Sequence, residues 1–138
     1  MITPIDYEIK QVSNDRIVKE YAKKNKVAGD VFRCSRLTVF GTDYKSGEYV
    51  LLPDSTNNSP VFGKIANLFC SADQGYLKYQ KTSNTYCMKL DIFYVKEEPG
   101  FDLIPVRQLA DYHPLIAYTV TGDRISISLR RFILEHIE

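Results

Sequence analysis

The chain has 138 residues, of which 44% are hydrophobic and 25% are charged, and its formal net charge is +1. This length suits a single domain with its own hydrophobic core, and this composition argues against intrinsic disorder. The near-balance of 18 Lys and Arg residues against 17 Asp and Glu residues argues against a surface that is basic throughout. Local charged patches remain compatible with it.

The three cysteines, Cys34, Cys70 and Cys87, are odd in number and no two are close in sequence. A secreted domain would pair its cysteines in an even framework, so we expect a reducing, intracellular setting, either cytoplasmic or nuclear. The N-terminal segment holds no apolar signal-peptide run, and no apolar run approaches the ~20 residues that cross a bilayer. We therefore expect a soluble protein without a membrane partner.

Residues 1–30 are expected to form an extended lead-in followed by one short helix. Apolar residues recur four positions apart, as in Ile17 and Tyr21, and make one stripe over residues 13–25. Ser13 has the chemistry of an N-cap, and Asp15 would sit favourably at the positive end of the helix.

From residue 31 onward, short apolar runs alternate with clusters of Gly, Pro, Asn, Asp and Ser, which is typical of β-strands joined by turns. We expect a mainly β domain over residues 31–138, a small and partly open barrel, with Gly63 marking a bulge or a close backbone approach. The C-terminal residues suit either a short helix or a continued strand. The expected strands cover residues 31–40, 48–52, 61–69, 75–82, 86–95 and 103–109. The expected turns and loops cover residues 41–47, 53–60, 83–85, 96–100 and 111–114.

The last hairpin carries the strongest local pattern. Gly122-Asp123 is a two-residue turn signal between two alternating runs. Such a turn places Val120 opposite Ile125 and Tyr118 opposite Ile127, so that the pairs on that face are apolar. A slip of one residue would mix apolar and polar faces, so the pattern itself predicts the register.

Candidate catalytic and metal-binding groups are few. The soft metal ligands are Cys34, Cys70, Cys87, His113 and His136. Their sequence gaps lack the close pairs that structural zinc sites use, and the sequence holds neither a nucleophile elbow nor a glycine-rich phosphate loop. We therefore expect no cofactor, no metal and no catalytic residue. An enzyme that pairs a cysteine with a histidine is the less favoured alternative.

Two sets of side chains are candidate binding residues. Residues 74–89 carry lysines and tyrosines without an acidic residue, and basic side chains interleaved with aromatics suit single-stranded nucleic acid. Other aromatics on the expected strands suit a groove for a peptide or a methylated lysine. The alternative for all of them is ordinary packing, with tyrosines inside and lysines in solvent. The candidate residues are Tyr44, Tyr49, Phe62, Tyr76, Lys78, Tyr79, Lys81, Lys89 and His113.

Two stretches carry resemblances to known families. Tyr44-Lys-Ser-Gly-Glu-Tyr-Val-Leu-Leu, then a polar loop and Pro60-Val-Phe-Gly-Lys-Ile, resembles the opening of a bromo-adjacent-homology (BAH) or related SH3-like barrel. A wider pattern, which adds Leu109-Ala-Asp-Tyr-His-Pro-Leu and Ile127-Ser-Leu-Arg, is similar to the C-terminal region of uncharacterised transposon-associated animal proteins. This second resemblance implies a non-catalytic accessory domain in a nuclear setting, with chromatin or DNA nearby.

The sequence therefore predicts a non-catalytic interaction module that recognises a protein or peptide, with the loops at residues 53–60 and 96–100 and nearby aromatics as its surface. The alternative function is a nucleic-acid-binding accessory domain of a transposon-derived protein, acting through Lys78, Lys81, Lys89 and Tyr79. Salt dependence separates the two, because phosphate contacts make affinity fall steeply with ionic strength.

Overall fold

The computed structural model describes residues 2–4, 14–27, 29–56, 59–72, 74–120 and 124–129. In these residues the fold is mainly β, with the α-helix α1 (Arg16–Lys24) and the short 3-10 helix η1 (Val106–Gln108). The strands form two sheets. The smaller sheet has the order β1-β3-β4, and the larger has the order β10-β11-β8-β7-β6-β5-β9, with β2 paired to β6 beside that path. Since the terminal strands β10 and β9 do not pair with each other, the larger sheet is open and does not close into a barrel.

The strand bounds show how the chain is divided between the sheets. The smaller sheet consists of β1 (Ile2–Pro4), β3 (Arg36–Val39) and β4 (Thr42–Lys45). The larger sheet consists of β2 (Phe32–Cys34), β5 (Tyr49–Leu51), β6 (Phe62–Cys70), β7 (Gly75–Cys87), β8 (Ile92–Pro105), β9 (Asp111–Leu115), β10 (Tyr118–Val120) and β11 (Arg124–Ile127).

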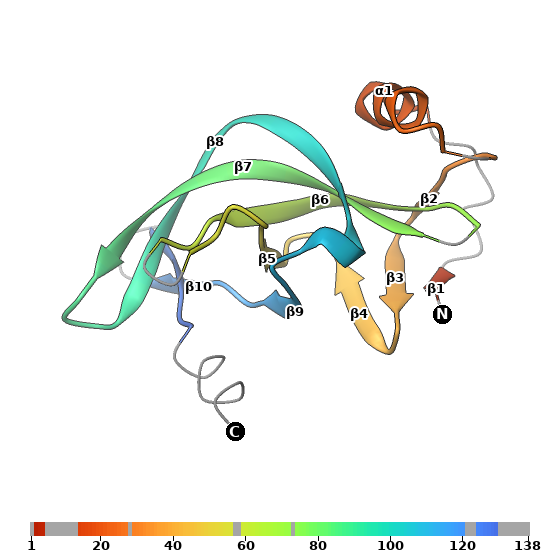
Figure 1. The fold of residues 1–138 in the computed structure, drawn as a ribbon. Coiled ribbons are helices and arrows are strands. Elements are labelled where there is room, and N and C mark those ends of the chain that lie inside the picture. The colour runs from red at the N-terminus through yellow and green to blue at the C-terminus, as the bar shows by residue number, and fades with distance from the viewer. Residues whose placement is uncertain are drawn as a thin grey trace.

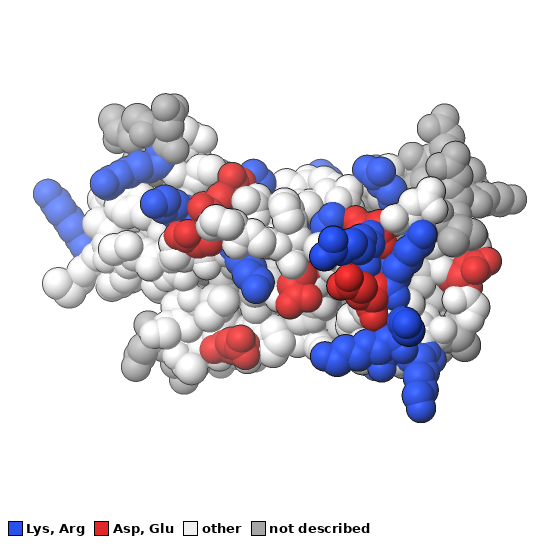
Figure 2. All heavy atoms as spheres, turned by 90° about the horizontal axis from the view of Figure 1, so that it is seen from above, with Lys and Arg blue, Asp and Glu red and all other residues white. Residues whose placement is uncertain are grey.

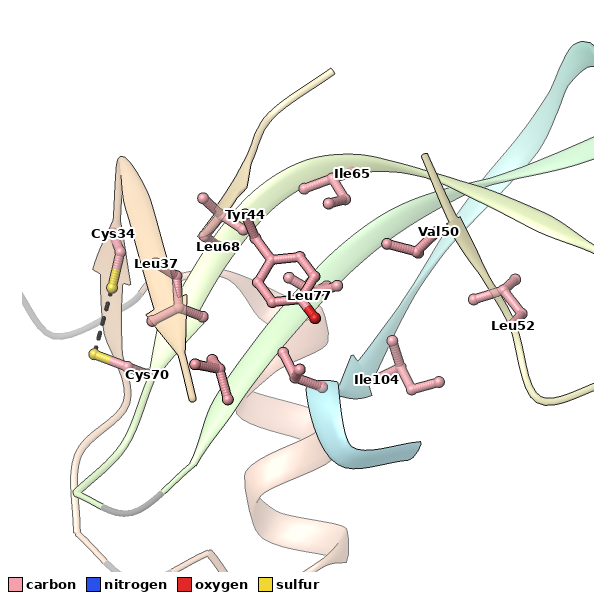
Figure 3. Packing of buried hydrophobic residues seen from close by; sticks show 12 residues of the cluster. Cys34, Leu37, Tyr44, Val50, Leu52, Ile65, Leu68, Cys70, Leu77 and Ile104 are labelled. Carbon is pink, nitrogen blue, oxygen red and sulfur yellow. Dashed lines mark hydrogen bonds between the residues drawn. The ribbon is translucent and has the colours of Figure 1, made fainter. Parts of the chain in front are cut away.

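The long strands β6, β7 and β8 form the centre of the molecule, with α1 on one side and the β3–β4 hairpin on the other (Figure 1). Strand alternation assigns the faces. Tyr76 packs under α1, whereas its neighbour Leu77 packs against the smaller sheet. The close view in Figure 3 shows Leu37 and Tyr44 of the smaller sheet beside Leu68 and Leu77 of the larger one. The main core therefore lies between the two sheets.

Helix α1 begins at Arg16, and its N-cap is Asp15. The Asp15 carboxylate accepts hydrogen bonds from the backbone N–H groups of Ile17, at 2.9 Å, and Val18, at 3.2 Å. Ser13, the expected cap, lies outside the described residues. Asp15 performs both functions that the sequence analysis divided between two residues, because its side chain caps the free N–H groups and its charge faces the positive helix end. No helix in the described part of the chain is long and apolar enough to span a membrane.

The prediction of one strand over residues 31–40 followed by a turn is wrong. The chain makes two strands there, β2 and β3, and the expected turn contains β4. Val39 pairs with Thr42, so Phe40-Gly41 is a two-residue hairpin turn. Its φ angles are 48° at Phe40 and 83° at Gly41, as a type I′ turn requires.

The predicted turn at residues 83–85 is also wrong, because β7 continues to Cys87 and residues 88–91 connect it to β8. Ser83 pairs with Lys96 and Thr85 pairs with Tyr94, so polar turn-forming residues serve as strand residues. Residues 96–100, expected as a loop, belong to β8, and residues 111–114, expected as a connection, belong to β9. Long-range pairing overrides local turn propensity in each case.

The predicted register of the last hairpin is wrong by one residue. Tyr118 pairs with Ser126 and Val120 pairs with Arg124, while the expected turn residues lie outside the described part of the chain. On its other side, β11 places Ile127 opposite Phe93 of β8. Ile127 is completely buried. The apolar residues of β11 therefore belong to the pairing with β8 and the core, which the hairpin pattern alone did not include.

At Gly63, where the sequence predicts a bulge or a close backbone approach, the structure shows a close approach made by a side chain. A β-carbon at this position would lie 2.8 Å from Cδ2 of Tyr79 on the neighbouring strand. The β6–β7 register also shifts between Ile65 and Asn67. The absence of a side chain at Gly63 lets the Tyr79 ring lie flat across β6.

Candidate functional site

Four of the aromatic residues expected at a binding surface are core residues. Tyr44 and Phe62 are completely buried, and Tyr49 and Tyr76 are 2% and 3% exposed. Phe62 and Tyr49 pack in one cluster, whereas Tyr76 packs against Tyr21 of α1 with ring centroids 5.6 Å apart. The strand positions of Tyr49, Phe62 and Tyr76 therefore reflect packing, and Tyr44 is a core residue that also lines a surface hollow.

The lysines expected to act together lie in different surroundings. Lys78 forms an ion pair with Asp15, with 2.7 Å between Nζ and Oδ2, and its ammonium lies 5.1 Å from the centroid of the Phe101 ring. This lysine fastens α1 to the sheet. Lys81 is exposed further along β7, and Lys89 is exposed in the β7–β8 turn. Tyr79 is half-buried over Gly63.

A hollow of about 580 Å³ lies where the β3–β4 turn meets η1 and the start of β9. Its floor is apolar and two aromatic side chains stand at its rim, so we call it the Phe40/Tyr112 groove. Its lining residues are Val39, Phe40, Tyr44, Val106, Arg107, Leu109, Ala110, Asp111 and Tyr112.

Phe40 is the most unusual residue of the groove. Its side chain is 82% exposed, and its backbone has the left-handed φ of 48°. A residue with a β-carbon loses roughly 1–2 kcal/mol in this conformation, and position 40 needs only a glycine or an asparagine to make the turn. Phe40 therefore lowers stability without contributing buried area, which is typical of residues retained for binding.

Tyr112 forms the opposite rim and is held by its neighbours. Its ring is 56% exposed and stacks on the His113 ring at a centroid distance of 4.3 Å. His113 Nδ1 lies 2.7 Å from Oδ1 of Asp111, and that oxygen also accepts the backbone N–H of His113 at 2.8 Å. His113, which we had considered as a contact to a ligand, is thus a support for Tyr112.

Tyr44 fixes the backbone of this rim from below. Its hydroxyl donates a hydrogen bond to the carbonyl of Tyr112. Burial, with a smaller contribution from the Asp111 carboxylate, raises the pKa of Tyr44 well above its ordinary value of 10.0. The hydroxyl therefore remains a donor at any physiological pH, and the rim is preorganised rather than formed on binding.

Charge at the groove is uneven. Arg107 lines it with an exposed side chain. The carboxylate of Asp111, the acidic residue in the lining, is 13% exposed and already engaged by His113. The groove therefore combines an apolar floor with the exposed Arg107 side chain in its lining.

A second hollow, of about 990 Å³, lies along the far end of the β7–β8 hairpin. Several of its charged and aromatic groups are engaged with one another. Lys64 pairs with Glu97 at 2.7 Å, and the Arg124 guanidinium lies 4.7 Å from the centroid of the Tyr94 ring. Serine, asparagine and threonine make up much of the remaining lining. A smaller share of the lining of this hollow is apolar than in the Phe40/Tyr112 groove.

The thiols and histidines do not assemble a metal site in the described part of the chain, where no group of three His, Cys, Asp or Glu residues could hold an ion. Cys34 and Cys70 lie together in the core, with 3.3 Å between their sulfurs. Cys87 is half-buried at the end of β7. His136 lies outside the described residues.

The sequence analysis did not select Phe40, Arg107 or Tyr112 as candidate binding residues. A signal for Phe40 was present, because an X-Gly pair between two alternating apolar runs is a hairpin turn, and an aromatic residue in such a turn has nothing to pack against. Arg107 carried no such signal, since its place at the groove depends on the long-range pairing of β5 with β9.

Comparison of the chain with family profiles, with curated proteins and with solved structures finds no match in any of the three.

Proposed function

We propose that this chain is a non-catalytic interaction module, an SH3- or BAH-like recognition domain, whose peptide ligand binds in the Phe40/Tyr112 groove. The observation that carries the proposal is the exposed aromatic pair above an apolar floor. Phe40 has a left-handed backbone conformation that lowers stability. The Tyr112 ring stacks on His113, and the Tyr112 carbonyl accepts a hydrogen bond from Tyr44. Aromatic residues at the rim of an apolar pocket are common binding hot spots.

The groove favours one kind of peptide. Its volume of about 580 Å³ accommodates a large apolar side chain between the two rings. Arg107 at the rim suits a carboxylate on a neighbouring residue of the same peptide. We therefore expect the ligand to present a bulky apolar residue next to Asp or Glu.

Selection of random peptides displayed on phage against the immobilised domain tests this proposal. We expect a consensus that contains an apolar residue beside an acidic one. A dye-labelled peptide of that consensus is then titrated in fluorescence anisotropy with the wild type and with Phe40→Gly. Because glycine relieves the left-handed strain, Phe40→Gly is expected to raise the free energy of unfolding by about 1 kcal/mol and to unfold at a higher urea concentration. The same variant is expected to bind the peptide at least about tenfold more weakly.

A matched control comes from the other end of the molecule. Met88 is also 82% exposed and lies far from the groove along the chain, in the β7–β8 turn. Met88→Ala is expected to bind the peptide as the wild type does, whereas Arg107→Glu weakens it. Equal affinity for Phe40→Gly and wild type, or a loss with Met88→Ala instead, would contradict the groove as the binding site.

A second candidate function, nucleic-acid contact, is supported by the distribution of charge. Figure 2 shows Lys and Arg gathered at the end of the molecule that carries α1, with some acidic residues among them. Residues 14–33 contain six Lys and Arg residues and three acids, and two of those acids are paired, Asp15 with Lys78 and Glu20 with Arg16. The exposed basic side chains here are Arg16, Lys19, Lys23, Lys24, Lys26 and Arg33.

Anisotropy with labelled single- and double-stranded DNA at two salt concentrations tests the second candidate. Phosphate contacts predict an affinity that falls steeply as salt rises. The double variant Lys19→Glu/Lys23→Glu on α1 is expected to abolish binding, and Lys81→Glu/Lys89→Glu on β7 and its turn is the matched control. If only the control variant loses DNA binding, the nucleic-acid surface is on β7 and not on α1. If the wild type does not bind DNA even at low salt, this second function is excluded.

A further inference from the structure

Cys34 and Cys70 meet in the core between neighbouring strands. Strand β2 pairs with β6 so that Phe32 lies opposite Cys70 and Cys34 lies opposite Leu68. Both sulfurs therefore project from the same face of the sheet. They lie 3.3 Å apart, as Figure 3 shows by the dashed line, and the two residues are 4% and 7% exposed.

We propose that Cys34 and Cys70 are a reversible dithiol–disulfide pair, oxidised by a low-molecular-weight disulfide, and that the bond joins β2 to β6. A disulfide needs about 2.05 Å between the sulfurs, so they must approach by about 1.3 Å from their present separation. The register makes the two residues diagonal neighbours, since each faces a different residue of the other strand. The approach therefore needs a small shift of the short strand β2 as well as side-chain rotation.

The chemistry balances with a low-molecular-weight disulfide as the oxidant. The Cys70 thiol loses its proton, and the thiolate attacks one sulfur of that disulfide, which releases the other half as a thiol and leaves a mixed disulfide on Cys70. Cys34 then loses its proton and attacks the Cys70 sulfur, which releases the second half. The protein dithiol is oxidised by two electrons and the small disulfide is reduced to two thiols.

The surroundings favour Cys70 as the first nucleophile. The Cys34 thiol donates a hydrogen bond to the Cys70 sulfur, and this bond, against the opposing effect of burial, lowers the pKa of Cys70. Access requires β2 to open. This strand has three residues and lies off the main path of the sheet, and short peripheral strands open at low free energy.

Oxidation has a structural consequence. The bond would close the loop of residues 34–70, which contains β3, β4, β5 and β6. Closing such a loop restricts the unfolded chain and stabilises the fold. In chain order, β2 lies between α1 and β3, the first strand of the smaller sheet after the helix. The bond would therefore also fix the part of the chain that leads from α1 to the smaller sheet.

The test uses the native wild-type chain incubated with oxidised glutathione, followed by maleimide labelling and peptide mass spectrometry. The chain has three cysteines. We expect Cys34 and Cys70 to become unreactive and to appear in one disulfide-linked peptide, with Cys87 still labelled or carrying glutathione. Dithiothreitol should restore all three thiols. The oxidised form should melt about 5 °C or more above the reduced form.

Variants separate this pair from adventitious oxidation. Cys87→Ala should form the same bond, whereas Cys34→Ala should end as a mixed disulfide between Cys70 and glutathione. Three free thiols after prolonged oxidation of the folded wild type would overturn the proposal. So would a bond that involves Cys87, or a Cys34–Cys70 bond that lowers the melting temperature.

Discussion

Two buried tyrosines differ in whether the hydroxyl group has a hydrogen-bond partner. This difference predicts opposite effects of a Tyr→Phe substitution on stability. The Tyr44 hydroxyl donates to the Tyr112 carbonyl. The Tyr49 hydroxyl is buried and has no hydrogen-bond partner in the described part of the chain. Removing a satisfied hydroxyl leaves an orphaned carbonyl, whereas removing an unsatisfied one relieves a desolvation cost.

We therefore expect Tyr44→Phe to lower the free energy of unfolding by about 1–2 kcal/mol, and Tyr49→Phe to leave it unchanged or raise it by about 1 kcal/mol. Urea denaturation of the two variants and the wild type measures both. Since Tyr44 also supports the rim of the groove, its variant should weaken the selected peptide, while the Tyr49 variant should not. Equal losses of stability would contradict this assignment.

The residue scale also shows why the sequence and the structure favour different candidate residues. Tyr44, Tyr49 and Phe62 were selected as aromatic residues on strands, but aromatic residues have high strand propensity whichever face they occupy. Sequence alternation gives the face relative to strand neighbours and does not say which face the second sheet covers. Phe40 was identifiable only once the turn was known to contain two residues.

At the scale of one element, Asp15 attaches α1 to the sheet as well as capping it. Burial opposes ionisation of Asp15, but the Lys78 ammonium and the N–H groups of Val18 and Ile17 outweigh it and lower the pKa below 3.8. A group whose folded pKa is depressed contributes stability above its unfolded pKa and loses that contribution as the pH falls through the folded value.

Asp15→Ala is thus expected to cost about 1–2 kcal/mol of unfolding free energy at pH 7. Asp15→Asn should cost less, because its amide oxygen still caps the helix while the ion pair is lost. The difference between wild type and Asp15→Asn should shrink as the pH falls below 3.8. Urea titrations at pH 7 and at low pH measure it, and a difference that grows in acid would contradict the depressed pKa.

The β7–β8 hairpin is the second element with a specific expectation. Pairing of β7 with β6 ends at Lys81, whereas its pairing with β8 continues to Cys87. Beyond Lys81, side chains replace the missing strand: Thr82 donates to the Phe62 carbonyl at 2.6 Å and Asn84 donates to the Pro60 carbonyl at 2.8 Å.

Hydrogen exchange should therefore be slow in residues 75–80 and faster in residues 83–87, because backbone amides exchange quickly where one side of a strand is unpaired. Asn84→Ala should speed exchange in the second segment and leave the first unchanged. Ser83→Ala is the control, since its hydroxyl donates a solvent-exposed hydrogen bond to the Glu98 carboxylate. Uniform protection along β7 would show that the far end is held by other contacts.

At the scale of the elements, the sequence predicted the features that depend on local patterns of residues. The mainly β class, the helix α1, the β5 and β6 strands and the close approach at Gly63 all follow from patterning. The extension of β7 through residues 83–85 and the register of the last hairpin do not, because both are decided by β8, which joins distant segments. A hairpin pattern contains no information about a third strand.

At the scale of the whole molecule, the three clusters of buried residues share the same central strands. On β6, Phe62 belongs to the cluster near β11, Leu68 to the core between the sheets, and Phe69 to the cluster under α1. Neighbouring residues of one strand thus serve different clusters on opposite faces. Loss of any cluster removes support from strands that the other two need, so the molecule should unfold as one unit.

Phe62→Leu and Phe69→Leu test this directly, since each disturbs a different cluster by about 1–2 kcal/mol. Both should shift one common urea transition to lower concentration with an unchanged slope. Far-UV circular dichroism follows the sheets, and tyrosine fluorescence reports on side chains throughout the chain, which has ten tyrosines and no tryptophan. The two signals should coincide in all three proteins. If Phe69→Leu instead separates an early transition from the main one, α1 and its cluster form an independent unit, and continuity of the strands is not sufficient for cooperative unfolding.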